Sequence, residues 1–272
     1  MIPKNDIKEA KTVIHSFLQT YLENSGCTDV VIGLSGGVDS AIVAVLCQQA
    51  FGKKHVHCIS LPEKTTPKID YTHKDLLCSS FDLTCQDIDI TSTVHHIMSQ
   101  LNKNMDKHTL ANLKARTRMS ILYSIANMHH ALVCGTSNKS EILIGYCTKY
   151  GDSGVDVQPI GDLYKTQVYE LARMLKIPRE IIDKPPTAGL WLGQTDEQEI
   201  GCSYKTLDCI LSGLEQKISL KQIAQHAGVT ETTVKQIQKM RKQSEHKRHT
   251  PLIPKIGLRT PGLDWRSPIL EG

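Results

Sequence analysis

Apolar residues follow two different spacings along the first part of the chain. Through residues 7–23 they return about every three to four positions, which predicts an amphipathic opening helix. Residues 29–34 form a short, continuous apolar run of the kind found in buried strands, and residues 40–50 continue as a strongly apolar helix. The order is therefore a strand, a glycine-containing turn and a buried helix.

The same alternation of strands and helices continues to residue 134. Strand-like runs occur at 56–61, near 84–88 and at 131–134, and helical spacing occurs at 71–81 and over the long segment 109–130. Strands that alternate with helices in this way pair in parallel, because each helix carries the chain back across the sheet. We therefore predict an α/β fold with a doubly wound, Rossmann-like parallel sheet, helices on both faces, and ligands at the carboxyl ends of the strands.

The second half of the chain has a different organisation. Residues 145–161 lose all periodicity but keep glycine and charged residues, which favours a substrate loop. One helix is predicted at 165–176 and three more between Asp196 and Met240. The sequence therefore predicts a helical part after the α/β part.

These segments predict one domain that spans residues 1–272. Its parts are an α/β nucleotide-binding core at 7–193, a helical segment at 194–248 and a tail at 249–272. The tail is rich in proline and glycine, so we expect it to have no regular structure. A chain of this length can bury a substantial core in a single unit.

The composition narrows the class of protein. Hydrophobic residues make up 40% of the chain and charged residues 22%, which is ordinary for a soluble globular protein. No apolar run approaches the ~20 residues that span a bilayer, so we expect no membrane partner. The N-terminus lacks a secretory signal and the nine cysteines contain no C-x-x-C pair, so we expect a reducing, cytoplasmic location. A net charge of +4 is too small to indicate nucleic acid by itself.

The strongest chemical signal is the segment Ser35-Gly-Gly-Val-Asp-Ser40, between the first strand and the apolar helix. Two glycines allow a tight turn that presents backbone N–H groups, and the helix N-terminus adds a partial positive charge, so this loop suits a phosphate or pyrophosphate. A carboxylate at Asp39 makes sense beside phosphates when it holds Mg²⁺. The predicted ATP-binding residues here are Gly33, Leu34, Ser35, Gly36, Gly37, Val38, Asp39 and Ser40.

This loop is neither a Walker motif nor a G-x-G-x-x-G motif. It resembles the S-G-G-x-D-S loop of the ATP pyrophosphatase superfamily, whose members cleave ATP between the α and β phosphates and adenylate a substrate. Further segments resemble the NAD synthetase family, in order along the chain. They are Asn112–Met119, Gly135–Glu141, Thr148–Asp156, Gly161–Thr166, Lys184–Ala188, Gln194–Glu197 and Ser244–Arg248.

The resemblance implies a specific reaction. Members of this family use ATP to adenylate the nicotinate carboxylate of deamido-NAD, and convert it to the amide of NAD with release of AMP and pyrophosphate. Glutamine-dependent members carry a large N-terminal amidase domain, for which a first strand at Asp29 leaves no room, so ammonia is the expected nitrogen source. Mg²⁺ is the expected cofactor, and a homodimer with the dinucleotide near the subunit interface is the expected assembly.

The resemblance also implies roles for single residues. Asp39 and Glu141 are expected to hold Mg²⁺. The ATP contacts beyond the glycine loop are Thr136, Lys165 and Thr187, and the deamido-NAD contacts are Arg116, Lys149, Asp156, His246 and Lys247. The expected catalytic residues are Asp39, Lys247 and Arg248, because cations on a closing loop can offset the negative charge that adenylation develops.

The chain departs from the family pattern at two places, and two alternative functions remain. Val38 stands where bacterial members commonly have Gln, and Ser137–Ser140 replaces Asp-His-Ala-Ala; both differences follow a second branch of the family. Residues 219–238 also match a DNA-binding helix-turn-helix, and a related enzyme such as a tRNA thiolase is a second alternative. We expect no nucleic-acid partner, because the helix-turn-helix segment directly precedes the expected substrate contacts His246 and Lys247.

Overall fold

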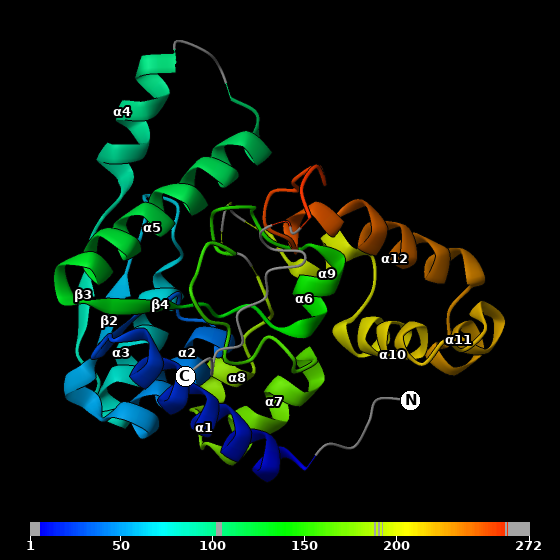
Figure 1. Ribbon diagram of the computed structural model, residues 1–272, viewed down its shortest axis with the longest axis horizontal. Helices are drawn as coiled ribbons and strands as arrows, with labels where there is room; N and C mark the ends of the chain where they lie inside the picture. The colour runs from blue at the N-terminus through cyan, green and yellow to red at the C-terminus, as the bar shows by residue number, and fades with distance from the viewer. Residues whose placement is uncertain are drawn as a thin grey trace.

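A parallel sheet lies at the centre of the molecule (Figure 1). The computed structural model describes residues 6–101, 105–187, 189, 191, 193–258 and 260, and within these the sheet has four strands in the order β3-β2-β1-β4. They are β1 (Asp29–Gly33), β2 (Val56–Ser60), β3 (Cys85–Asp87) and β4 (Ala131–Cys134). Every neighbouring pair is parallel. The predicted parallel α/β sheet is confirmed.

Helices make up most of the rest of the described chain. The α-helices are α1 (Ile7–Ser25), α2 (Val38–Phe51), α3 (Lys68–Phe81), α4 (Thr91–Leu101), α5 (Lys107–His129), α6 (Lys139–Ile144), α7 (Lys165–Met174), α8 (Arg179–Ile182), α9 (Asp196–Ile200), α10 (Tyr204–Glu215), α11 (Leu220–Ala227) and α12 (Glu231–Gln243). Two short 3₁₀ helices are η1 (Lys53–His55) and η2 (Glu245–Lys247). None of the described helices is both long and apolar enough to cross a membrane.

Alternate residues of β1 face opposite layers of helices. Val30 and Ile32 belong to a hydrophobic cluster with α1, α2 and α7, whereas Val31 belongs to a cluster with α4 and α5. Side chains alternate in this way because successive residues of a strand point to opposite faces. Helices therefore cover both faces of the sheet, as expected for a doubly wound fold.

Helix α2 fixes the loop that precedes it. Its residues from Ala41 to Cys47 are all buried, and α1 and α7 pack against it. A helix that is apolar on all sides is stable only inside a core. The loop between β1 and α2 is therefore attached to two of the most buried elements of the molecule.

The helices α10, α11 and α12 form a second hydrophobic core beside the sheet (Figure 1). Leu207, Ile223 and Ile237 are fully buried there, and this unit packs on α6 and α7. The prediction of three helices between Asp196 and Met240 was wrong in number, because the structure adds the short helix α9. The short helices α6 and α8 and the helix α4 were also not predicted as separate elements.

The strand order creates a crevice at the carboxyl end of β1. From β1 the chain adds β2 and β3 on one side, and then returns to place β4 on the other side of β1. The connections after β1 and β4 leave in opposite directions at such a switch point, and the space between them is where ligands bind in open α/β sheets. Residues 249–258 and Thr260 have no regular structure, as expected, and the rest of the predicted tail lies outside the described residues.

Candidate active site

A cavity of about 530 Å³ opens at the crevice between β1 and β4. Small-molecule sites typically enclose ~300–1,000 Å³. The predicted site residues that line it are Gly33, Leu34, Ser35, Gly37, Val38, Asp39, Ser40, Thr136, Glu141, Lys165, Thr187 and Lys247. The fold therefore brings together predicted residues that lie far apart in the sequence.

The loop after β1 has a backbone that requires glycine. Gly36 has a φ of +75°, and a Cβ there would lie 2.4 Å from the carbonyl oxygen of Asp70. The Ser40 hydroxyl donates to the Gly37 carbonyl at 3.0 Å and accepts from the Ser35 N–H at 3.3 Å. Helix α2 begins directly after Gly37, so its first N–H groups add a partial positive charge. The loop is a preformed cradle for an anion.

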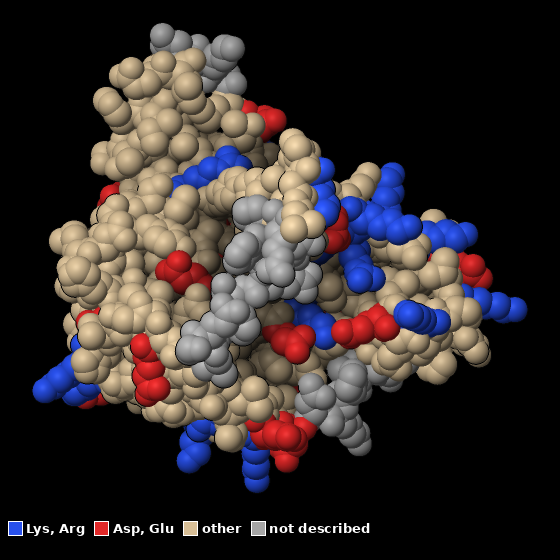
Figure 2. All heavy atoms as spheres, viewed as in Figure 1, with Lys and Arg blue, Asp and Glu red and all other residues tan. Residues whose placement is uncertain are grey.

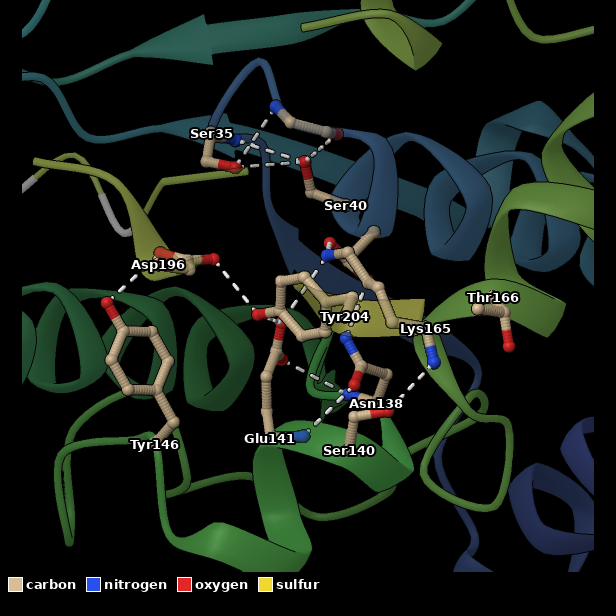
Figure 3. A network of polar contacts seen from close by, with 12 residues as sticks. Ser35, Ser40, Asn138, Ser140, Glu141, Tyr146, Lys165, Thr166, Asp196 and Tyr204 are labelled. Atoms are coloured by element: carbon tan, nitrogen blue, oxygen red, sulfur yellow. Dashed lines mark hydrogen bonds and ion pairs between the residues drawn. The ribbon is translucent and has the colours of Figure 1, made fainter. Parts of the chain in front are cut away.

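A buried lysine joins two carboxylates beside this loop (Figure 3). The Lys165 side chain is 2% exposed, and its Nζ lies 2.5 Å from Asp39 Oδ2 and 3.4 Å from Glu141 Oε1. Asn138 donates from Nδ2 to Asp39 Oδ1 at 3.0 Å. The lysine comes from α7 and the carboxylates from α2 and α6, so the centre links three elements of the fold.

Burial changes the protonation of this centre. It raises the pKa of Glu141 to about 7, an effect that Lys165 opposes and that Asp39 and Asp196 reinforce. Burial acts to lower the pKa of Lys165, but the attraction of Asp39 and Glu141 outweighs it and raises that pKa. Lys165 is therefore charged at neutral pH, whereas Glu141 stands between its charged and neutral forms.

Asp39 and Glu141 also supply the oxygen donors that Mg²⁺ prefers. In the part of the chain that the structure describes, no group of three or more His, Cys, Asp and Glu side chains is arranged to hold a metal ion. Two carboxylates would supply only part of the oxygen shell of Mg²⁺, and phosphate oxygens and water would have to supply the rest. This donor set fits Mg²⁺ that arrives with ATP.

The turn after β4 explains how Glu141 reaches the site. Its N–H donates to Asn138 Oδ1 at 3.1 Å, and the Asn138 N–H donates to Glu141 Oε2 at 3.3 Å, which forms a capping box at the start of α6. Ser140 donates to Asp208 at 2.5 Å and accepts from the Lys165 N–H at 2.9 Å. The Ser-Asn-Lys-Ser turn of this chain therefore positions both Glu141 and Lys165.

Sequence reasoning missed two tyrosines and two carboxylates around this centre; Figure 3 labels Tyr146, Asp196 and Tyr204. The Tyr204 hydroxyl lies 3.3 Å from Glu141 Oε1 and 3.0 Å from Asp196 Oδ2. The Tyr146 hydroxyl lies 3.1 Å from Asp196 Oδ1 and 2.6 Å from Glu199 Oε2. The segment that contains Asp196 matched the family pattern, which was the available signal, whereas nothing in α10 pointed to Tyr204.

The other predicted residues do not line the cavity as the structure describes it. They are Gly36, Arg116, Lys149, Asp156, His246 and Arg248. Arg116 is exposed and donates from Nε to the Lys149 carbonyl at 3.2 Å. Asp156 accepts hydrogen bonds from the Val133 N–H at 2.8 Å and the Tyr123 hydroxyl at 2.9 Å, so its carboxylate also supports the fold.

The end of the basic segment packs against the loop after α6. Lys247 Nζ donates to the carbonyl oxygens of Gly145 at 2.7 Å and Cys147 at 2.6 Å. Arg248 donates to two carbonyl oxygens in the last turns of α6, at 3.1 and 2.9 Å. His246 is exposed. Lys247 therefore reaches the cavity, while Arg248 satisfies the end of a helix.

Comparison with known proteins identifies the family. The family model described as NAD synthase matches residues 10–251, which include the loop after β1, Glu141, Lys165 and Lys247. The chain belongs to the NAD synthase family. It is 41% identical to the NH(3)-dependent NAD(+) synthetase of Methanosarcina acetivorans, over 92% of this chain and 99% of that protein. It is 40% identical to the NH(3)-dependent NAD(+) synthetase of Methanocaldococcus jannaschii, over 94% and 100%.

Solved structures agree with this assignment to the NAD synthase family. The NMN synthetase of Francisella tularensis has a TM-score of 0.83 and 31% identity, and covers 93% of this chain and 100% of its own. The NH3-dependent NAD synthetase of Campylobacter jejuni has a TM-score of 0.79 and 31% identity, with coverage of 92% and 100%. The fold described above is therefore shared with proteins of this family.

Proposed function

We propose that this protein makes NAD from deamido-NAD, ATP and ammonia, and releases AMP and pyrophosphate. The observation that carries this proposal is the convergence of the Ser35–Ser40 loop with Lys165, Asp39 and Glu141 in one cavity. A cradle for phosphate oxygens beside carboxylates suited to Mg²⁺ fits chemistry at the phosphates of ATP. Membership of the NAD synthase family supports the nicotinate carboxylate as the group that is activated.

The reaction consists of two substitutions. A carboxylate oxygen of deamido-NAD attacks the α-phosphorus of ATP, the bond from that phosphorus to the bridging oxygen breaks, and pyrophosphate leaves. Ammonia then attacks the carbonyl carbon of the adenylate, AMP leaves with one of the original carboxylate oxygens, and the nitrogen loses a proton. Negative charge must be offset at the α-phosphate and on the departing pyrophosphate.

The residues of the cavity divide these tasks. We assign the phosphates of ATP to the N–H groups and hydroxyls of the loop after β1, together with Thr136 and Thr187. Lys165 offsets phosphate charge, and its partners Asp39 and Glu141 would hold Mg²⁺. Mg²⁺, when bound, neutralises and orients phosphate oxygens. Lys247 adds a positive charge at the cavity wall.

The predicted contacts outside the cavity suit an interface between two copies of the chain. We propose a homodimer in which Arg116, Lys149, Asp156 and His246 contact deamido-NAD near that interface. Arg116 is exposed and donates to the Lys149 carbonyl at 3.2 Å, so these two residues lie together where a second copy of the chain can reach them. Arg248 would act by keeping the preceding lysine in place. Sedimentation analysis of the purified protein tests this assembly, and a monomer at micromolar concentration would reject it.

We also propose a cytoplasmic location without a nucleic-acid partner. All nine cysteines are free thiols, which supports a reducing compartment. Figure 2 shows Lys and Arg side chains on the side of the molecule where Figure 1 places α11 and α12, and the exposed ones include Lys221, Lys235 and Lys239. We interpret this face as solvated surface, because α12 leads directly into Lys247. Filter binding of duplex DNA and tRNA at two salt concentrations tests this; tight, salt-dependent retention would contradict it.

A mononucleotide is the second candidate substrate. The Francisella tularensis protein is named as an NMN synthetase, and its structure is similar to this chain over its whole length. The same chemistry on nicotinate mononucleotide would give NMN, because the reacting carboxylate is identical and only the adenylate half is missing. The two candidates therefore differ in the contacts beyond the reacting ring.

A direct comparison of the two substrates tests the proposal. Purified protein is incubated with ATP, Mg²⁺ and ammonium, together with either deamido-NAD or nicotinate mononucleotide, and products are separated by chromatography. We expect a kcat/KM at least about tenfold higher with deamido-NAD, which corresponds to ~1.4 kcal/mol of transition-state discrimination. The opposite preference would assign the mononucleotide, and no amide from either would reject both.

A further inference from the structure

Arg118 is an arginine of the cavity to which sequence reasoning assigned no role. It lies in α5 two residues after Arg116, and it lines the cavity, whereas Arg116 is exposed outside it. Residues two positions apart on a helix face different directions. In this chain the fold therefore turns the second arginine of the Ala115–Met119 segment toward the cavity.

The guanidinium of Arg118 has donors to spare. Its Nε donates to the carbonyl oxygen of Leu61, directly after β2, at 2.9 Å. An arginine carries five N–H donors, and this bond uses one of them. Among the residues that the structure describes, no carboxylate forms an ion pair with this guanidinium.

Two carboxylates act on Arg118 through space, Glu63 and Asp152, and each already accepts a hydrogen bond from another residue. Glu63 accepts from Lys114 Nζ at 2.7 Å; burial acts to raise its pKa, but the hydrogen bonds from Lys114 and Thr65 outweigh burial and the pKa falls to about 2. Asp152 accepts from the Thr148 N–H at 2.7 Å. Burial lowers the pKa of Arg118, although both carboxylates oppose this through space. Carboxylates of the protein therefore neutralise the positive charge of Arg118 only in part.

Arg118 adds a second positive charge to the cavity, apart from that of Lys165. Leu61 follows β2 and Glu141 follows β4, and these strands lie on opposite sides of β1. Arg118 and the Lys165 centre therefore lie on different sides of the phosphate loop. A partly buried cation without a direct counter-ion destabilises the folded protein, and a bound anion offsets that destabilisation. Two anionic substrates could each meet a cation there.

We propose that Arg118 binds an oxyanion of a substrate inside the cavity through its remaining N–H groups. The anion is the nicotinate carboxylate or a phosphate oxygen, because a planar guanidinium recognises both in the same bidentate way. This inference rests on the proposed function and adds a specificity-determining residue to it.

Binding without turnover tests the assignment. Isothermal titration calorimetry is run with deamido-NAD, with NAD, and with α,β-methylene ATP plus Mg²⁺, on wild-type protein and on Arg118→Gln and Arg118→Lys. The control is Arg173→Gln, which removes an exposed arginine from α7. We expect Arg118→Gln to weaken at least one probe by about tenfold to hundredfold, as for a charge-assisted bidentate contact, with partial recovery in Arg118→Lys and no change in the control.

The pattern of losses names the anion. Weaker binding of deamido-NAD but not of NAD identifies the carboxylate, because the product carries an amide there. Equal losses for both dinucleotides identify a dinucleotide phosphate, and a loss confined to the ATP analogue identifies ATP. Unchanged binding of all three probes by Arg118→Gln would overturn the proposal, as would equal weakening of all three with a lowered unfolding temperature in both Arg118 variants. Failure of wild-type protein to bind deamido-NAD would instead count against the proposed function.

Discussion

Replacing Glu141 with glutamine should stabilise the protein at alkaline pH, even though it removes a proposed Mg²⁺ ligand. Burial raises the pKa of Glu141 from its ordinary 4.5 to about 7. In the unfolded chain this carboxyl loses its proton near the ordinary pKa, whereas in the folded protein it does so only near pH 7. The free energy of unfolding therefore falls as the pH rises from about 4.5 to about 7, and the full loss is present above pH 7.

The size of the effect follows from the same two pKa values. One pKa unit corresponds to ~1.4 kcal/mol, so the rise from 4.5 to about 7 sets an upper limit of about 3 kcal/mol at pH 8. Glutamine stays neutral at every pH but no longer offers a charge to Lys165, so we expect a net gain of about 1–3 kcal/mol. At ~2–4 °C per kcal/mol for a chain of this size, the unfolding midpoint should rise by about 2–12 °C.

Thermal unfolding followed by circular dichroism at pH 8 and pH 5 measures this gain. It should be largest at pH 8 and fall below about 1 kcal/mol at pH 5, where the folded carboxyl of Glu141 is already protonated. Glu215→Gln is the control, because hydrogen bonds from Tyr164 and Lys139 lower the pKa of Glu215, so neutralising it should not raise the midpoint. A Glu141→Gln midpoint at pH 8 no higher than that of wild type would refute the reasoning, and so would equal gains at both pH values.

Three further outcomes are expected. Lys247→Ala should lower kcat more than it raises KM for ATP, because a charge at the cavity wall acts mainly on the transition state. Steady-state kinetics measure both constants. A change confined to thermal stability would show that Lys247 only anchors the backbone at Gly145 and Cys147. Gly36→Ala should abolish binding of an ATP analogue, since its Cβ would lie 2.4 Å from a backbone oxygen. Gly228→Ala is the control, because Gly228 also has a positive φ but a Cβ there would meet nothing within 4 Å, so this variant should bind normally. Calorimetry distinguishes the two, and tight binding by Gly36→Ala would contradict the cradle. Ammonium should support turnover and glutamine should not, because the relatives that this chain matches over 99–100% of their length are NH(3)-dependent; equal rates with ammonia-free glutamine would reject this.

The order of strands and helices was predictable because each element carries its own pattern. The apolar run before Ser35 and the buried helix after it predict the phosphate loop, and β1 and α2 have the expected bounds within a few residues. The short helix α9 was not predictable in this way, because five residues are too few to show a helical period. Local periodicity therefore predicts the longer elements and misses the short ones.

The centre of the site depends on contacts that no local pattern contains. Asp39 and Lys165 lie 126 positions apart and meet only because α2 and α7 pack together. The family resemblance supplied both residues, but not Tyr204, whose hydroxyl reaches Glu141 from another helix. Similarly, the resemblance named Arg116, while the choice between Arg116 and Arg118 depends on which face of α5 meets the cavity.

The fate of the carboxylate oxygen tests the central claim most directly. Deamido-NAD with ¹⁸O in its nicotinate carboxylate is converted with ATP, Mg²⁺ and ammonium, and the products are analysed by mass spectrometry. If the carboxylate attacks the α-phosphorus of ATP, one ¹⁸O atom appears in AMP, the other stays in the amide of NAD, and pyrophosphate is unlabelled. Formation of ADP with labelled phosphate would place the attack at the γ-phosphorus and contradict the proposed adenylation, and unlabelled AMP would contradict it as well.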